Sequence, residues 1–170
     1  MSWKEHYQQH LMSAEEAVKH IQSGNRAVVA HACGEPSYLL DAMVANASAY
    51  KDVEIVHMVA MGKGEYCKPE YAANFRHNAF FVGGSTRAAI EEGRGDFTPS
   101  FFFEVPRQFS TTMPVDVAMV MVTPPDENGM CSLGVSVDYT QEAVKQAKTV
   151  IAQVNPQMPW TGPYSLVSVE

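Results

Sequence analysis

Basic residues are few in this sequence of 170 residues, which has 12 Lys and Arg against 19 Asp and Glu and a formal net charge of −7. No segment gathers Lys and Arg into a cluster that could neutralise a nucleic-acid backbone. The apolar runs are also far shorter than the roughly 20 residues that a membrane-spanning helix needs. We therefore expect no nucleic-acid partner and no membrane association.

Cysteine is scarce as well: Cys33, Cys67 and Cys131 stand far apart and include no CxxC pair. This number and spacing exclude a disulfide framework and a zinc knuckle, and the histidines show no metal-ligand spacing, so we expect no metal. The first six residues are polar and lack the apolar segment of a signal peptide. A soluble protein of the reducing cytoplasm is the expectation.

Hydrophobic residues make up 46% of the sequence and charged residues 18%, a composition that supports a buried core and excludes disorder. Short apolar segments alternate with helical patterns, with strands predicted at 27–32, 53–59, 79–82, 115–122 and 149–154. Helices are predicted at 36–47, 86–92 and 138–147, and another between a Ser13 cap and Gly24. This alternation predicts one α/β domain over residues 1–170, with a Rossmann-like, mainly parallel sheet and helices on both faces.

The remaining segments are less regular. Residues 2–11, 71–75 and 106–112 are predicted as short helical segments, and 97–105 as extended chain. Residues 164–170 are predicted to begin another strand, with no later element to pack on it.

The loop at 123–134 follows the predicted strand at 115–122, whose last six residues are all apolar. Two prolines stop the strand, and Asp126 to Gly129 supply a tight turn. Because open α/β sheets hold ligands at the carboxyl ends of their strands, Glu127 and Asn128 are candidate site residues. The alternative is an ordinary turn whose acidic side chains are only solvated.

Two glycine-containing loops are further candidates. Gly62 and Gly64 allow close approach of a ligand to the backbone, and Lys63 places an ammonium group beside it for a carboxylate or phosphate. Gly84 and Ser85 lie between a predicted strand and a helix, where unpaired N–H groups favour an anion. The alternatives are an exposed lysine on a glycine turn and a serine that only caps the helix.

His31 and Cys33 stand two residues apart at the end of a predicted strand, so their side chains are expected on one face. Such a pair could form a nucleophile and its base, although no third, orienting residue can be identified. The alternative is a cysteine that acts as a small buried apolar group.

Five segments together resemble the N-terminal domain of the acetyl-CoA hydrolase/transferase family, and within it the 4-hydroxybutyrate and butyryl-CoA:acetate CoA-transferases. They occur in order along nearly the whole chain and read GEP (34–36), MVAMGKG (58–64), GSTRAAIEEGRGDFTP (84–99), PPDENGMCSLG (124–134) and NPQMP (155–159). The resemblance implies a two-domain enzyme that moves CoA between carboxylic acids, with its active site between two Rossmann-like domains.

The resemblance also implies covalent catalysis, in which a glutamate attacks the acyl-CoA thioester and becomes a glutamyl-CoA thioester. In this family the nucleophile and most CoA contacts lie in the C-terminal domain, which this sequence does not include. We therefore expect an inactive isolated chain, a C-terminal CoA-transferase domain as partner, and a homo-oligomer. Substrate contacts are expected at Gly34, Glu35, Gly62, Lys63, Gly64, Glu127 and Asn128, and contacts to CoA, the co-substrate, at Gly84 and Ser85.

Three functional hypotheses follow. The first is the N-terminal half of a CoA-transferase for acids such as acetate, butyrate or 4-hydroxybutyrate, or of an acetyl-CoA hydrolase. The second is a non-catalytic domain that binds CoA or a carboxylate, or that serves in assembly. The third is a small hydrolase that uses Cys33 and His31.

Overall fold

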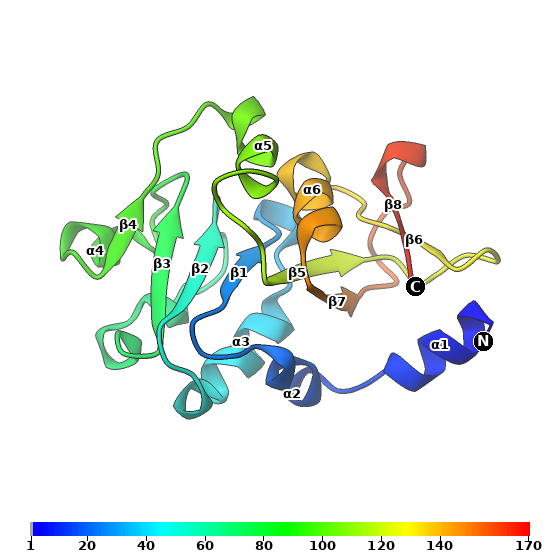
Figure 1. Ribbon diagram of the computed structural model, residues 1–170, viewed down its shortest axis with the longest axis horizontal. Helices are drawn as coiled ribbons and strands as arrows, with labels where there is room; N and C mark the ends of the chain where they lie inside the picture. Colours follow the sequence, from blue (N-terminus) through cyan, green and yellow to red (C-terminus); the bar gives the residue numbers. More distant parts are fainter. Residues whose placement is uncertain (1) are drawn as a thin grey trace.

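The structure is a computed structural model that describes residues 2–170. Its centre is a six-stranded parallel sheet in the order β4-β3-β2-β1-β5-β7 (Figure 1). Its strands are β1 (Arg26–Val29), β2 (Val53–His57), β3 (Phe75–Ala79), β4 (Gly95–Phe97), β5 (Val117–Val122) and β7 (Thr149–Val154). A second, two-stranded antiparallel sheet joins β6 (Met130–Ser132) to β8 (Leu166–Ser168). The predicted α/β fold with a mainly parallel sheet is confirmed.

Helices lie on both faces of the large sheet (Figure 1). The α-helices are α1 (Trp3–His10), α2 (Ala14–Ala17), α3 (Ser37–Ala45), α4 (Arg87–Glu91), α5 (Val105–Phe109) and α6 (Asp138–Gln146). Short 3₁₀ turns occupy η1 (Val18–His20), η2 (Ala32–Gly34), η3 (Ala47–Ala49), η4 (Glu65–Cys67), η5 (Pro69–Tyr71), η6 (Phe102–Glu104) and η7 (Pro163–Ser165).

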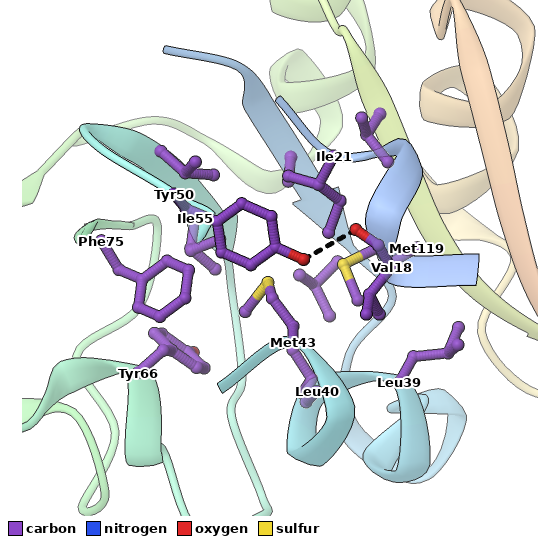
Figure 2. Close-up of a cluster of buried hydrophobic side chains, with 14 of the residues drawn as sticks. Val18, Ile21, Leu39, Leu40, Met43, Tyr50, Ile55, Tyr66, Phe75 and Met119 are labelled. Carbon is purple, nitrogen blue, oxygen red and sulfur yellow. Dashed lines mark hydrogen bonds between the residues drawn. The ribbon is translucent and has the colours of Figure 1, made fainter. Parts of the chain in front are cut away.

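Alternate residues of the central strands build two separate cores. Ala27 and Val29 of β1 pack with α2 and α3, whereas Val28 points to the opposite face, where α5 and α6 pack. A strand covered on both faces reads as a continuous apolar run, which is why β1 and β5 are recognisable in the sequence. Figure 2 shows the first core, in which the Tyr50 hydroxyl donates a hydrogen bond of 2.7 Å to the carbonyl of Val18.

Several predicted boundaries are wrong. The strand expected at 79–82 is β3 over Phe75–Ala79, and the helix expected at 71–75 is replaced by the η5 turn and the start of that strand. The segment 97–105, expected to be extended, becomes helical from Phe102. β3 escaped prediction because its sequence carries Arg76, His77 and Asn78, and the last two are buried.

The C-terminal strand does have a neighbour, contrary to the prediction. β8 pairs with β6 in the register Met130 to Ser168 and Ser132 to Leu166. The Ser132 and Ser165 hydroxyls are 2.8 Å apart in the buried part of this small sheet. The local sequence of neither strand indicates its partner, because the pairing joins segments more than thirty residues apart.

Candidate functional site

The strand order reverses its direction between β1 and β5. From β1 the chain moves to β2, β3 and β4 on one side, and it returns to β5 on the other side of β1. Ligands of open α/β sheets bind beyond the carboxyl ends of the strands at such a point of reversal. The segment that leaves β1, residues 30–36, lies at this point of reversal, and the segment that leaves the neighbouring strand β2, residues 58–64, lies beside it at the same edge of the sheet.

Glu35 ties these two segments together. Its side chain is buried, and Oε2 accepts hydrogen bonds from the backbone N–H of Met61 at 2.9 Å and of Gly62 at 3.0 Å. A Cβ atom on Gly62 would lie 2.1 Å from Glu35 Oε1, so any other residue at this position would require the Glu35 carboxylate or the loop to move. The carboxylate of Glu35 is thus directed into the protein, where it fixes the start of the Gly62–Gly64 loop.

A buried histidine lies behind this carboxylate. His57 Nδ1 is 2.9 Å from the Tyr66 hydroxyl, and Nε2 is 3.8 Å from Glu35 Oε2. Burial, followed by the nearby His77 and His31, lowers the pKa of His57 to about 3, so the ring is neutral near pH 7. Burial likewise raises the pKa of Tyr66 well above its ordinary value and keeps its hydroxyl protonated. The pair at 3.8 Å is therefore a polar contact with a neutral ring and not an ion pair.

Lys63 stands on the solvent side of the same loop. Its Nζ lies 3.2 Å from Asp41 Oδ2, and the two side chains are 68% and 54% exposed. An exposed pair of this kind contributes little to stability, so the ammonium group is free to exchange partners. A cavity of about 190 Å³ lies beside it. The loop, Glu35 and, from α3, Leu40 line this cavity.

Gly64 and Ser85 complete this cluster. Gly64 has φ of 61°, and a Cβ there would lie 2.9 Å from the carbonyl oxygen of Ser85. The Ser85 hydroxyl donates a 2.9 Å hydrogen bond to the carbonyl of Ala60. Ser85 does not cap α4, because Thr86 holds the N-cap position and makes no side-chain cap there. The alternative interpretation of Ser85 as a helix cap is therefore wrong.

Gly34 and Gly84 differ in their surroundings. A Cβ on Gly34 would lie 2.2 Å from the Cβ of Ser136, so this glycine lets the segment after β1 pack against the segment before α6. Gly84 has no atom within 4 Å of a Cβ position and faces open space. Of the predicted site residues, the structure thus gathers Glu35, Gly62, Lys63, Gly64 and Ser85 on one side of the sheet's carboxyl edge.

Glu127 and Asn128 lie elsewhere, in the exposed connection from β5 to β6. Figure 1 shows this connection at the end of the molecule opposite to α4 and β4. Asp126 forms the turn, since its Oδ1 accepts the backbone N–H groups of Asn128 and Met130, both at 2.8 Å. Gly129 lies against Trp3 of α1, where a Cβ would come within 2.7 Å of the indole. Within this chain, Glu127 and Asn128 are not part of the cluster around Glu35.

His31 has a partner that the sequence did not reveal. His31 Nε2 is 2.8 Å from Asp138 Oδ2, and the centroid of its ring lies 4.9 Å from that of Tyr139, with the two planes tilted by 32°. Burial opposes ionisation of Asp138, but hydrogen bonds, first that of His31, outweigh it and lower the pKa of Asp138. Asp138 was expected only to cap a helix, and nothing in the local sequence links it to a residue 107 positions earlier.

The hypothetical pairing of His31 with Cys33 is not present. β1 ends at Val29, Ala32 has φ of 52°, and Cys33 lies in the exposed η2 turn. The two side chains therefore do not share the face of a strand, and His31 is bound to Asp138 instead. This removes the geometric basis of the hydrolase hypothesis.

Over residues 2–170, no three His, Cys, Asp or Glu side chains gather as a metal-ligand set. Nor does a helix in this part of the chain have the length and apolarity to cross a membrane.

Comparison with known proteins gives the site a context. Residues 1–164 match the model of the acetyl-CoA hydrolase/transferase N-terminal domain. The chain is 54% identical over 162 residues to 4-hydroxybutyrate coenzyme A transferase of Clostridium kluyveri, a match that covers 95% of this chain and 38% of the relative. It is 32% identical to butyryl-CoA:acetate CoA-transferase of Anaerostipes caccae, covering 94% of this chain and 36% of the relative.

Two solved structures superpose on 99% of this chain. RipA from Yersinia pestis superposes with a TM-score of 0.90 at 28% identity, over 99% of this chain and 42% of that chain. A 4-hydroxybutyrate CoA-transferase from Porphyromonas gingivalis gives 0.82 at 32% identity, over 99% of this chain and 39% of that chain. The chain spans less than half the length of each of these proteins. It belongs to the acetyl-CoA hydrolase/transferase family and corresponds to the N-terminal domain of that family.

Proposed function

We propose that the chain is the N-terminal domain of a CoA-transferase that moves CoA from an acyl-CoA to a short-chain carboxylate such as acetate, butyrate or 4-hydroxybutyrate. The observation that carries this proposal is the 54% identity to 4-hydroxybutyrate coenzyme A transferase over 95% of the chain. The succinyl-CoA:cyclohexane-1-carboxylate CoA transferase of Geobacter metallireducens, at 36% identity, supports the same reaction class with a different acid.

In this proposal the cluster around Glu35 forms the carboxylate side of the active site. Lys63 supplies the cation for the acid substrate, and Gly62 and Gly64 let the substrate approach the backbone. Glu35 supports the loop from behind, because its carboxylate already accepts the N–H groups of Met61 and Gly62. It is a positioning residue in this scheme and makes no contact with the substrate.

The covalent chemistry would belong to the C-terminal domain. A glutamate carboxylate attacks the thioester carbonyl, the carbon–sulfur bond breaks, and CoA leaves as a thiolate. An acyl-glutamyl anhydride remains. The thiolate then attacks the glutamyl carbonyl, which forms a glutamyl-CoA thioester and releases the first acid. The incoming carboxylate attacks this thioester and displaces the CoA thiolate, which then attacks the acyl carbonyl of the resulting anhydride. This step yields the new acyl-CoA and releases the glutamate as a free carboxylate. CoA enters as co-substrate, and the isolated chain is expected to be inactive.

A chimera tests the proposal. Residues 1–164 of this chain replace the matched part of the C. kluyveri enzyme, and transfer of CoA from butyryl-CoA to acetate is measured. The expected result is turnover with a CoA adduct in the intact mass that borohydride removes. Lys63→Ala should lower kcat/KM at least tenfold, whereas Lys51→Ala, an exposed lysine outside the cluster, should leave it unchanged.

Two outcomes would overturn the proposal. Hydrolysis of butyryl-CoA at a rate independent of acetate would assign the domain to an acyl-CoA hydrolase. A folded chimera with no turnover and no adduct would favour a non-catalytic binding or assembly domain.

A further inference from the structure

The strand β7 forms one margin of the large sheet and leaves that margin open (Figure 1). Its register with β5 runs from Thr149 against Val117 to Val154 against Val122. Among residues 2–170, no strand pairs with its other side. Open edges are usually blunted by charge, proline or a bulge, but β7 carries none of these in Thr-Val-Ile-Ala-Gln-Val.

The backbone groups at this edge can be assigned from the pairing. The N–H of Thr149 donates to Asp116, and the N–H of Asn155 donates to Val122, so alternate residues from 149 to 155 face β5. In a parallel ladder the residues between them direct both N–H and C=O to the opposite side. Val150, Ala152 and Val154 thus present three donors and three acceptors to the open edge, with no hydrogen-bond partner among residues 2–170.

The edge lies in a groove of about 820 Å³ that is lined by residues of α1, α2, α3, α6 and of the strands β5 to β8. Tyr7 and Leu11 line it from α1 and the segment that follows, β7 lines its base, and Leu166 to Glu170 line it from β8 onward. Leu11 is 55% exposed and Val150 is 43% exposed, so the groove presents apolar surface to water. The helix α1 has no fully buried residue, and its residues Tyr7 and His10 line the groove.

We propose that an extended strand of the C-terminal CoA-transferase domain occupies this groove and pairs with β7 as the seventh strand of the sheet. Three observations support this occupant. The edge offers backbone groups in the alternation that strand addition requires, and its flanks are apolar. The curated relatives extend well beyond the region matched by this chain, which covers 38% of one and 36% of another. The proposal rests on the proposed function in that it takes the CoA-transferase C-terminal domain as the partner.

A second copy of this chain fits the groove less well. Pairing of β7 with β7 across a twofold axis would bring α1 and β8 of both copies against the same edge. A single extended segment needs only the space between these walls. The groove therefore suits a strand of the other domain better than a second copy of this chain.

Hydrogen exchange resolved to single amides tests the pairing in the same chimera. The outward amides of Val150, Ala152 and Val154 alternate with those already bound to β5, and a neighbouring strand, parallel or antiparallel, would protect all three. We expect exchange at these positions to slow at least a hundredfold from the isolated chain to the chimera. Ala152→Pro removes one outward N–H without touching the β5 ladder and should abolish the protection of Val150 and Val154, whereas Ala152→Ser, which keeps the N–H, should not.

The readouts separate this inference from the proposed function. An active chimera whose edge amides exchange as fast as in the isolated chain would overturn the strand pairing while CoA transfer stands. An inactive chimera with protected edge amides would leave the pairing in place and remove the function. A dimeric isolated chain by light scattering, with the same amides already protected, would assign the edge to a second copy and overturn the proposal.

Discussion

The carboxylate of Glu35 lies 3.0 Å from the backbone nitrogen of Gly62, 27 positions later in the sequence. This contact fixes the loop that carries Lys63 to the segment that leaves β1, and the neighbouring N–H of Met61 shares the same oxygen. A buried carboxylate with two backbone donors is a charge-assisted arrangement, stronger than neutral hydrogen bonds.

Glu35→Ala should therefore lower the free energy of unfolding by about 2–4 kcal/mol, because it leaves two N–H groups without their acceptor. Urea denaturation measures this change. Glu91→Ala serves as the control, since this glutamate is exposed on α4, and it should shift stability by less than about 0.5 kcal/mol. Equal effects of the two substitutions would show that the Glu35 contact has no structural role.

Gly62→Ala tests the same contact from the other side. The added methyl group would lie 2.1 Å from Glu35 Oε1, so the carboxylate or the loop must move. We expect a loss of about 1–3 kcal/mol, typical of overpacking, in thermal unfolding. Gly162→Ala is the matched control, because nothing lies within 4 Å of its Cβ position and its φ is −64°. A Gly62→Ala variant as stable as the control would contradict the tight packing.

Stability should fall on mild acidification because of two buried histidines. Burial lowers the pKa of His57 to about 3 and of His77 to about 4, against 6.5 when unfolded. Below pH 6.5 the unfolded chain binds protons that the folded chain does not, so stability is full above that pH and is lost as the pH drops toward 4. Each histidine lowers the free energy of unfolding by about 1.4 kcal/mol for each pH unit below 6.5, and the two together lower it by about 2.7 kcal/mol per pH unit.

Urea denaturation at intervals between pH 7.5 and 4.5 measures this slope. His20→Gln removes an exposed imidazole and should leave the slope unchanged. A free energy of unfolding that stays constant over this range would show that His57 and His77 can take up protons in the folded state.

The three cysteines should differ sharply in reactivity. Cys33 is exposed, whereas burial raises the pKa of Cys67 to about 12 and that of Cys131 to about 11. Since the thiolate is the reactive form, iodoacetamide at pH 8 should add one group to the folded protein and three to the denatured protein. Intact mass gives the count, and Cys33→Ser should reduce the folded count to zero. Rapid double modification of the folded protein would contradict the burial of the other two.

The elements that the sequence predicted well are those with local signals. The capping box of Ser13 and Glu16 is present, although the helix expected between Ser13 and Gly24 is only α2, followed by the η1 turn. β5 follows from its apolar residues. The predicted position of β3 was wrong because its buried polar residues have partners on the neighbouring strand β2: the Ile55 carbonyl lies 3.2 Å from His77 Nδ1, and Glu54 accepts from the amide of Asn78. Such partners become visible only once the sheet has formed.

The residues of the candidate site likewise divide into those with a local sequence signal and those whose role depends on distant contacts. The glycine positions of the Gly62–Gly64 loop are local and were predicted, but the inward direction of the Glu35 carboxylate depends on a contact between two loops. The pairing of His31 with Asp138 depends on the packing of α6 beside β1, which no short-range pattern encodes. Glu127 was singled out by its turn, yet the turn is formed by Asp126 and lies far from the other candidates.

The strand order also bears on how the protein is made. The strands β1 to β4 lie side by side in the order of their synthesis, so each can pair with the one before it as it leaves the ribosome. β5 must instead return to the exposed side of β1, a strand completed almost ninety residues earlier. Until residue 122 has emerged, that side of β1 is an open edge, and this interval is when the nascent chain most needs protection from association with other chains.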